Sequence, residues 1–285
     1  MAIKKLEEEL QVKLFERNAN EITVTPLGEE IVRQAQSVLE QADSIREIAR
    51  RGKDPLAGSL RLGVIYTIGP YLLPDLVRQA IAHTPQMPLM LQENFTVKLL
   101  EELRTGEIDC AILAEPFPDT NLAIAPLYDE PFMAAVPSTH PLAARTSVTA
   151  EELKKETLLL LGTGHCFRDH VLEVCPEFAH FSSSAEGINK SFECSSLETI
   201  KHMVAAGMGI TLVPRLGVPK EALAATSKNA SADQPSYIKY LPFEGHVPTR
   251  RVVLAWRRSF TRYEAIAALR NASYACELPG VMSLS

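Results

Sequence analysis

The hydrophobic pattern of the chain changes near Ser59, and the change indicates the class of fold. Before it, residues 26–51 carry small and apolar side chains at a three-four-three-four spacing, which predicts one long helix with a coiled-coil seam. After it, short apolar segments at residues 60–65, 87–92 and 109–114 alternate with helical ones. This alternation predicts an α/β domain with a mainly parallel sheet. A second series, from about residue 130 onward, predicts a second lobe of the same class.

The long helix has a clear start signal. Thr25 can cap it, Pro26 stands at its first position, and Glu29 and Glu30 lie in its first turn. About 26 residues exceed the usual length of a globular helix, so we favour dimerisation through this helix over packing within its own domain. The seam consists of Gly28, Ile31, Ala35, Val38, Ala42, Ile45 and Ala49.

Composition excludes several classes of protein. The longest uncharged stretches have 14 residues, fewer than the 18 or so that span a bilayer, and the charged N-terminus is unlike a signal peptide. We therefore expect a cytoplasmic protein with no membrane contact. With 29 basic and 35 acidic residues the chain has a net charge of −6, so any DNA site must be local. Five cysteines, an odd number, argue against a disulfide framework in a reducing compartment.

The densest cluster of reactive side chains lies in residues 162–175. A glycine turn after the strand expected at residues 157–161 places Cys166 near a helix N-terminus, close to His165, Arg168 and His170. Each of these features favours the thiolate, so Cys166 is a candidate low-pKa nucleophile. Ordinary packing of a small apolar side chain is the alternative.

Cys175 follows Cys166 by nine residues and could resolve an oxidised sulfur. Nine helical residues span about 13.5 Å, whereas a disulfide joins Cα atoms about 4.4 to 6.8 Å apart. The two thiols could therefore bond only if the helix unwound, which would make oxidation a conformational switch. A zinc site of His165, Cys166, His170 and Cys175 matches no recognised spacing, and we expect neither a metal nor a cofactor.

Polar residues at predicted helix starts form a second set. Thr67 follows the first strand, Thr96 is expected to cap the helix after the second, and residues 195–198 read as a capping box. Ordinary capping explains each one alone. Together they would line one cleft between the lobes, the usual ligand position in α/β sheets.

Several of these segments together resemble the LysR-type transcriptional regulators. Residues 2–17 resemble the end of the recognition helix and the wing entry, residues 24–28 resemble the wing exit, and residues 197–214 are similar to the effector-domain signature. The resemblance covers essentially the whole chain. Residues 67–74 and 164–169, with a cysteine nine residues beyond Cys166, closely resemble the OxyR peroxide-sensor subgroup.

The resemblance implies the domain organisation. Residues 1–25 would be the C-terminal remnant of a winged helix-turn-helix, and residues 26–57 the linker helix and hinge. The effector domain would be two-lobed and similar to the periplasmic binding proteins. Residues 58–129 with 246–285 would form regulatory lobe I, and residues 130–245 regulatory lobe II.

The resemblance also implies a mechanism. Cys166 would be the peroxidatic cysteine that becomes a sulfenic acid, and Cys175 the resolving cysteine of a reversible disulfide. The residues that bind peroxide or support the sulfur would be Thr67, Thr96, His165, Asp169 and Arg257. The DNA-contacting remnant would comprise Lys4, Lys5, Arg17 and Thr25.

The same resemblance implies the partners. They would be hydrogen peroxide, cellular thiol reductants, promoter DNA, RNA polymerase and further copies of the chain in a homodimer or homotetramer. About 30 family residues that build most of the DNA-reading head are absent here, and residues 1–51 hold 8 basic and 10 acidic side chains. We therefore expect the full-length protein, and not this chain, to bind DNA specifically.

Three alternatives stay open. A regulator of the same family could bind a small organic anion between the lobes, and then Cys166→Ser would be silent. A thiol peroxidase would need turnover with a reductant, for which no docking site is evident, so we expect no enzyme. A solute-binding protein would have a similar two-lobed shape, but the sequence shows no export signal.

Overall fold

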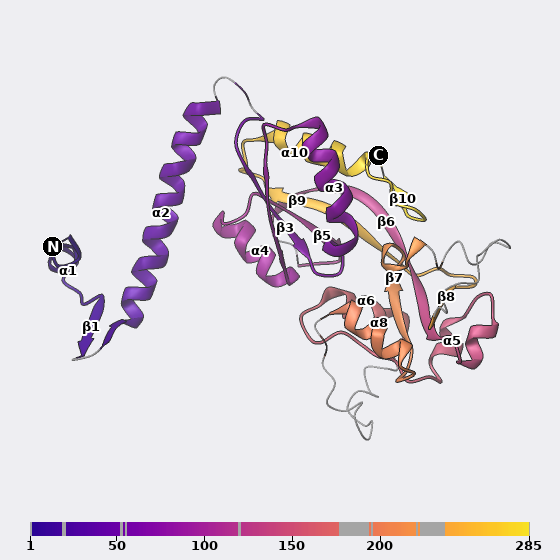
Figure 1. The fold of residues 1–285 in the computed structure, drawn as a ribbon. Coiled ribbons are helices and arrows are strands. Elements are labelled where there is room, and N and C mark those ends of the chain that lie inside the picture. The colour runs from indigo at the N-terminus through magenta and orange to yellow at the C-terminus, as the bar shows by residue number, and fades with distance from the viewer. Residues whose placement is uncertain are drawn as a thin grey trace. The chain divides into compact units, whose positions relative to one another are not determined.

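The computed structural model describes residues 2–18, 21–51, 54, 56–118, 121–176, 194, 196–220, 222 and 237–284. The chain divides into two compact units, Met1–Ala57 and Gly58–Ser285 (Figure 1). Among the described residues, no helix combines the length and the apolar character that a bilayer crossing requires.

The first unit contains two helices and a hairpin. Helix α1 (Ala2–Leu10) precedes the antiparallel strands β1 (Phe15–Asn18) and β2 (Glu21–Val24), and helix α2 spans Pro26–Arg51, as predicted. Thr25 caps α2, because its Oγ1 accepts the Gly28 N–H at 2.9 Å. Along the predicted seam, Val38 and Ile45 are exposed. Dimerisation through this face stays a prediction.

The second unit is built on two sheets that share one long strand. In the first sheet the strand order is β10-β6-β9-β5-β3-β4, and the second consists of β7 and β8 paired with the end of β6. The long strand β6 runs from one sheet into the other (Figure 1). The strands are β3 (Leu60–Ile65), β4 (Leu89–Asn94), β5 (Cys110–Glu115), β6 (Leu122–Pro137), β7 (Thr211–Pro214), β8 (Ile238–Pro242), β9 (Thr249–Arg257) and β10 (Met282–Ser283).

The prediction of a mainly parallel sheet is wrong. Among the described strands only β3 with β4 and β3 with β5 pair in parallel, and every other pair is antiparallel. The reason is that β9 inserts between β5 and β6 and runs against both. The pairing of β5 with β9 joins segments more than 130 residues apart, so no local pattern reports it.

Helices cover both sheets. Around the first sheet lie α3 (Gly69–His83), α4 (Thr96–Thr105) and α10 (Tyr263–Tyr274), with α3 in contact with α10. Helix α4 is followed by Gly106, which caps it with a φ of 88°. Glycine adopts this left-handed conformation without the steric strain that a side chain would cause. The elements in the part of the chain that contains the second sheet are η1 (Pro141–Ala144), α5 (Ala150–Leu153), α6 (Cys166–Val174), α8 (Leu197–Ala205) and η3 (Arg215–Gly217).

A separate apolar core supports the second sheet. Phe132 from β6, Phe167 and Val171 from α6, and Ile200 from α8 are all buried in it. Residues 157–161, expected to be a strand, form only isolated bridges from Leu158 and Leu161. The loop expected at residues 224–236 lies outside the described residues, as does most of the strand expected at residues 191–194. The division into two lobes at residues 129/130 and 245/246 stays a prediction.

Candidate functional site

The ends of two parallel strands face the start of helix α6. Thr67 follows β3, Thr96 follows β4, and Cys166 is the first residue of α6 with His165 at its N-cap. All four line one small pocket, which confirms that they lie together. Carboxyl ends of parallel strands are a usual ligand position, because the backbone there leaves groups unpaired. Residues 196–198, expected at the same cleft, do not line this pocket, and Ser195 lies outside the described residues.

The pocket is very small. Its volume is about 10 Å³, and Tyr66 and Phe95 supply its aromatic walls. The His165 ring packs edge-on against Phe95 with the ring centroids 4.8 Å apart. A cavity of roughly 10–15 Å³ is the least that holds one water molecule. The site therefore accepts only a very small ligand unless these rings move.

The expectation of a low-pKa thiol at Cys166 is wrong for this conformation. Burial raises the pKa of Cys166, because the thiolate loses its hydration. The Thr96 hydroxyl, which has no other hydrogen-bond partner in the described chain, and the charge of Arg250 act in the opposite direction. The sulfur is thus held protonated, beside two groups that would stabilise its charged form.

The two histidines that were expected to supply positive charge do not, and Arg168 is engaged with a backbone carbonyl. Burial lowers the pKa of His165 and the pKa of His170, so both rings are neutral at pH 7. His170 bonds the Glu115 carbonyl through Nε2 at 2.7 Å, and Arg168 donates to the Leu161 carbonyl at 2.9 Å. Desolvation, which sequence alone does not report, removes the positive charge expected on both histidines.

The positive charge at the site comes from Arg250, a residue that the sequence analysis missed. Its Nη1 donates to the Thr67 hydroxyl at 2.9 Å, and its Nη2 donates to the Thr67 carbonyl at 2.9 Å. The Thr67 hydroxyl therefore accepts from Arg250 and keeps its own hydrogen for another acceptor. The guanidinium also lies over the Phe167 ring, 5.3 Å from the centroid.

Arg250 is held by a buried ion pair. Its Nε and Nη2 both donate to Glu130, at 2.9 and 2.7 Å, and both side chains are fully buried. Glu130 and Arg250 face each other on β6 and β9, next to the point where β6 leaves the first sheet. The other Glu130 oxygen accepts the Leu216 N–H at 2.9 Å. The protein therefore supplies hydrogen bonds to both buried charges, which offsets part of the cost of burying them.

Cys175 lies at the other end of the same helix as Cys166. It is the C-cap residue of α6, its side chain is fully buried, and its N–H bonds the Val171 carbonyl. Both cysteines are in the reduced, thiol form here. The helical spacing therefore keeps the two sulfurs apart, as predicted, and burial shields Cys175 from reagents in solution.

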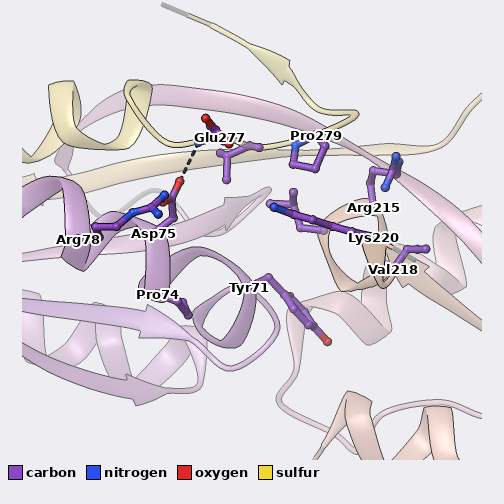
Figure 2. A pocket seen from close by; sticks show the side chains of 11 residues that line it. Tyr71, Pro74, Asp75, Arg78, Arg215, Val218, Lys220, Glu277 and Pro279 are labelled. Atoms are coloured by element: carbon purple, nitrogen blue, oxygen red, sulfur yellow. Dashed lines mark hydrogen bonds and ion pairs between the residues drawn. The ribbon is translucent and has the colours of Figure 1, made fainter. Parts of the chain in front are cut away.

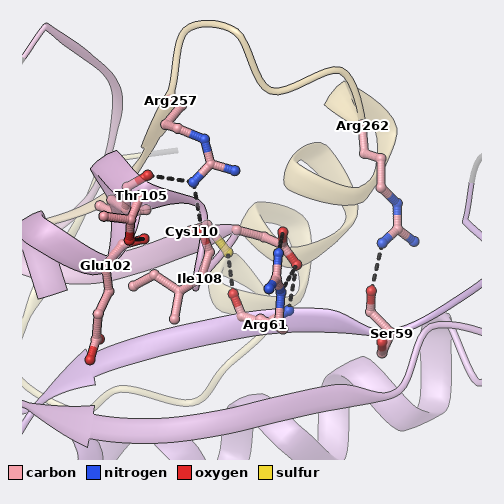
Figure 3. A network of polar contacts seen from close by, with 10 residues as sticks. Ser59, Arg61, Glu102, Thr105, Ile108, Cys110, Arg257 and Arg262 are labelled. Atoms are coloured by element: carbon pink, nitrogen blue, oxygen red, sulfur yellow. Dashed lines mark hydrogen bonds and ion pairs between the residues drawn. The ribbon is translucent and has the colours of Figure 1, made fainter. Parts of the chain in front are cut away.

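Arg257, expected near the reactive sulfur, does not line the pocket around it. Figure 3 shows its guanidinium beside α4 and β5, where it donates to the Leu103 and Ile108 carbonyls, the second at 2.8 Å. In the same network Arg61 pairs with Asp109 at 3.0 Å, and Arg262 donates to the Ser59 carbonyl at 2.6 Å. Arg257 and Arg262 thus hold backbone carbonyls beside the first sheet, and Arg61 holds a carboxylate, so the role of all three is structural.

Two expected caps also differ. Thr96 is the first residue of α4 and makes no capping bond, because Phe95 occupies the N-cap position. At α8 the cap is Ser196, which accepts the Thr199 N–H, whereas Glu198 instead pairs with Lys201 and accepts a hydrogen bond from Tyr71. The hydroxyl of Thr96 is therefore free for the pocket.

The remaining residues predicted for the peroxide site and the DNA-contacting remnant lie in different parts of the chain. Asp169 lies in the first turn of α6, near enough to Cys166 to favour its neutral form. Lys4 and Lys5 are exposed on α1, and Thr25 serves as the cap of α2. The side chain of Arg17 lies outside the described residues. No cluster of three or more metal-ligating side chains occurs in the described chain.

A pH profile tests the protonation state of Cys166. Because its pKa is raised, the rate of its alkylation by iodoacetamide should increase about tenfold per pH unit from pH 6 to 8. Peptide-resolved mass spectrometry measures this rate separately from the other thiols, and the Cys166→Ser variant gives the background. A rate that levels off below pH 7 would contradict the raised pKa.

Comparison with known proteins gives a consistent set of similarities. The family model described as the LysR substrate binding domain matches residues 53–274. A hydrogen peroxide-inducible genes activator of Dickeya chrysanthemi is 37% identical over 268 residues, which are 93% of this chain and 82% of the relative.

Solved structures agree with this result. A full-length OxyR variant from Pseudomonas aeruginosa superimposes with a TM-score of 0.71 at 46% identity, covering 96% of this chain and 87% of that one. A hydrogen-peroxide-bound OxyR mutant of Corynebacterium glutamicum superimposes with a TM-score of 0.67 at 31% identity, covering 96% and 81% of the two chains.

Proposed function

This chain belongs to the LysR-type transcriptional regulators, in the OxyR subgroup, and we propose that it is a hydrogen-peroxide-responsive gene activator switched by a Cys166–Cys175 disulfide. The family consists of transcriptional regulators and not of enzymes. The observation that carries the proposal is the pocket at the start of α6, where the Cys166 sulfur lies with Thr67, Thr96 and His165 in about 10 Å³ of space.

The first step is oxidation of Cys166. The sulfur attacks as the thiolate, one oxygen of hydrogen peroxide is transferred to it, and the O–O bond breaks. Hydroxide leaves and takes up a proton to become water, and Cys166 becomes a sulfenic acid. The Thr67 hydroxyl, fixed by Arg250, and the unpaired Thr96 hydroxyl are the donors that would orient the peroxide and the leaving oxygen.

The second step joins the two cysteines. The Cys175 thiol attacks the sulfenic sulfur, the S–O bond breaks, and the oxygen leaves as water with the thiol proton. Overall, two thiols are oxidised and one peroxide is reduced to two waters. Because both cysteines belong to one helical segment, α6 has to unwind before the sulfurs meet. The disulfide thus couples the redox state to a two-state element, and cellular thiol reductants would reset it.

The readout would follow from the unwinding of α6. We propose that its refolding changes how subunits pack in a homotetramer, and so the spacing of the DNA-binding heads on promoter DNA and their contact with RNA polymerase. The alternative is a regulator of the same family that responds to a small organic anion bound between the lobes, and in that case Cys166→Ser would be silent. A carboxylate with a carbon body does not fit in the 10 Å³ pocket at Cys166 itself.

Disulfide mapping tests this proposal. One equivalent of peroxide, followed by alkylation and mass spectrometry, should give a Cys166–Cys175 disulfide within seconds, and Cys166→Ser should give none. Cys110→Ser, which removes a fully buried thiol of β5, is the matched control and should leave the disulfide intact. If Cys166 and Cys175 both stay alkylatable after unfolding of the treated protein, the redox mechanism is wrong.

A further inference from the structure

Helix α6 has to unwind in the proposed switch, and a cavity lies against its second half. The cavity, of about 390 Å³, is lined by His170, Glu173 and Val174 of α6 and by residues of the segment 243–249. Another cavity, of about 300 Å³ between α3 and the turn after β7, has no lining residue on α6 (Figure 2). The second half of α6 therefore borders open space, so it can move without displacing packed side chains on that side.

A hydrogen bond from His170 joins this half of the helix to the first sheet. Its Nε2 lies 2.7 Å from the carbonyl oxygen of Glu115, the last residue of β5. Because a carbonyl can only accept, the hydrogen is on Nε2, and Nδ1 is then the bare nitrogen of a neutral ring. Nδ1 is buried without a hydrogen-bond partner in the described chain. The ring thus holds α6 as a neutral donor.

The surroundings of His170 oppose a positive charge on its ring. The residue is only 5% exposed, and the fully buried Arg250 of β9 repels an imidazolium. The titratable groups that face it from α6 and from the segment 243–249 are all exposed, so water and salt screen them. They are Asp169, Glu173, Glu244 and His246. Burial therefore dominates and lowers the pKa of His170.

We propose that His170 is a positioning residue for the peroxide switch, because its hydrogen bond to β5 keeps α6 wound and Cys166 apart from Cys175. When the helix opens, the ring is exposed to water and can take up a proton. The hold on α6 should therefore weaken as the pH falls. The link to peroxide sensing rests on the proposed disulfide, whereas the hold on α6 exists in the reduced chain.

The direction of the pH effect follows from the two states of the helix. His170 has an ordinary pKa of about 6.5 when α6 is open and a lowered pKa when α6 is closed. The contribution of His170 to the closed helix is therefore fully present above about pH 6.5, and it is lost as the pH falls toward the lowered pKa. Between roughly pH 7.5 and 5.5 the change favours opening by up to about tenfold.

Hydrogen exchange of the reduced chain tests the proposal. The exchange of α6 amides, corrected for its intrinsic pH dependence and measured by peptide-resolved mass spectrometry, gives the opening constant of the helix. His170→Gln keeps an N–H donor but cannot titrate, whereas His170→Met has a similar length and helix propensity but no donor. At about pH 7.5 we expect the Gln variant to exchange like the wild type and the Met variant about tenfold faster. A side chain that only fills space would make the two variants alike.

The pH profile gives a second readout. From about pH 7.5 to 5.5, the opening constant of wild-type α6 divided by that of His170→Gln should increase several-fold. His83→Gln, which replaces an exposed histidine of α3, is the matched control and should exchange like the wild type throughout. The amides of α10 should exchange alike in all variants, because the opening is local. The proposal is overturned if the ratio is independent of pH or if the Met variant exchanges as slowly as the Gln variant.

Peroxide treatment separates this proposal from the proposed function. Starting from the sulfenic acid, His170→Met should form the Cys166–Cys175 disulfide about tenfold faster than His170→Gln, because its helix is open more often. Equal rates in the two variants would overturn the role of His170 in the switch. If neither variant nor the wild type forms the disulfide, the proposed function is wrong, while the exchange rates still decide whether His170 holds α6.

Discussion

Replacing Arg250 by methionine is expected to lower the free energy of unfolding by about 3–5 kcal/mol. The reason is that the change leaves the Glu130 carboxylate fully buried without its cation. It also removes both hydrogen bonds to Thr67 and the charge that favours the Cys166 thiolate. We therefore expect slower oxidation of Cys166 as well, measured under conditions where the variant is folded.

The neighbouring residue provides the control. Arg251 pairs with Asp129 on the same two strands at 2.9 Å, but its side chain is about half exposed. Because water and salt screen an exposed pair, Arg251→Met should cost far less stability than Arg250→Met. Urea denaturation of both variants measures the difference.

A double variant separates the two causes of instability. Glu130→Gln combined with Arg250→Met removes the unpaired charge and should recover part of the lost stability. It should not restore the two hydrogen bonds from Arg250 to Thr67. Equal stability of Arg250→Met and Arg251→Met would show that the buried pair has no special energetic role.

Replacing Cys175 by serine is expected to stop peroxide oxidation at the sulfenic acid. With one equivalent of peroxide, Cys166 should gain one oxygen, detectable by mass spectrometry or with a sulfenate-specific dione reagent. With excess peroxide it should go on to the sulfinic acid, because no thiol captures the intermediate. The effect is all or none, since the second step of the proposed mechanism is lost.

Cys194→Ser is the matched control for Cys175→Ser. Cys194 is also a buried thiol in the core of the second sheet, but it is not on α6. It should form the Cys166–Cys175 disulfide at the wild-type rate. A sulfenic acid that is equally long-lived in the Cys194 variant would mean that Cys175 is not the resolving residue.

Local signals predicted the helices well. The cap at Thr25 and the proline after it place the start of α2, and the glycine turn before Cys166 places the start of α6. Such signals act within a few residues, so the sequence contains them in full. The antiparallel insertion of β9 was missed because it is decided by pairing between distant segments.

The choice between Arg257 and Arg250 shows a second limit. Each belongs to a pair of adjacent arginines near β9, and the sequence alone does not tell which one enters the site. A signal was nevertheless present, because the doublet Asp129-Glu130 on β6 matches the doublet Arg250-Arg251 on β9. Alternation along a strand then buries one pair and exposes the other.

Protonation states were the least predictable property of the site. The sequence placed His165 beside Cys166 correctly, but it did not show that His165 and His170 are both buried. Desolvation outweighs proximity for His165, His170 and Cys166, so all three groups are neutral where the sequence analysis expected charges.

The size of the pocket at Cys166 has a consequence for selectivity among oxidants. In about 10 Å³ between Tyr66 and Phe95, an alkyl group attached to a peroxide meets an aromatic wall. The size of an oxidant would thus decide whether it reaches the Cys166 sulfur, whatever its chemical reactivity. Tert-butyl and cumene hydroperoxides, although they carry the same O–O bond, should oxidise Cys166 far more slowly than hydrogen peroxide does.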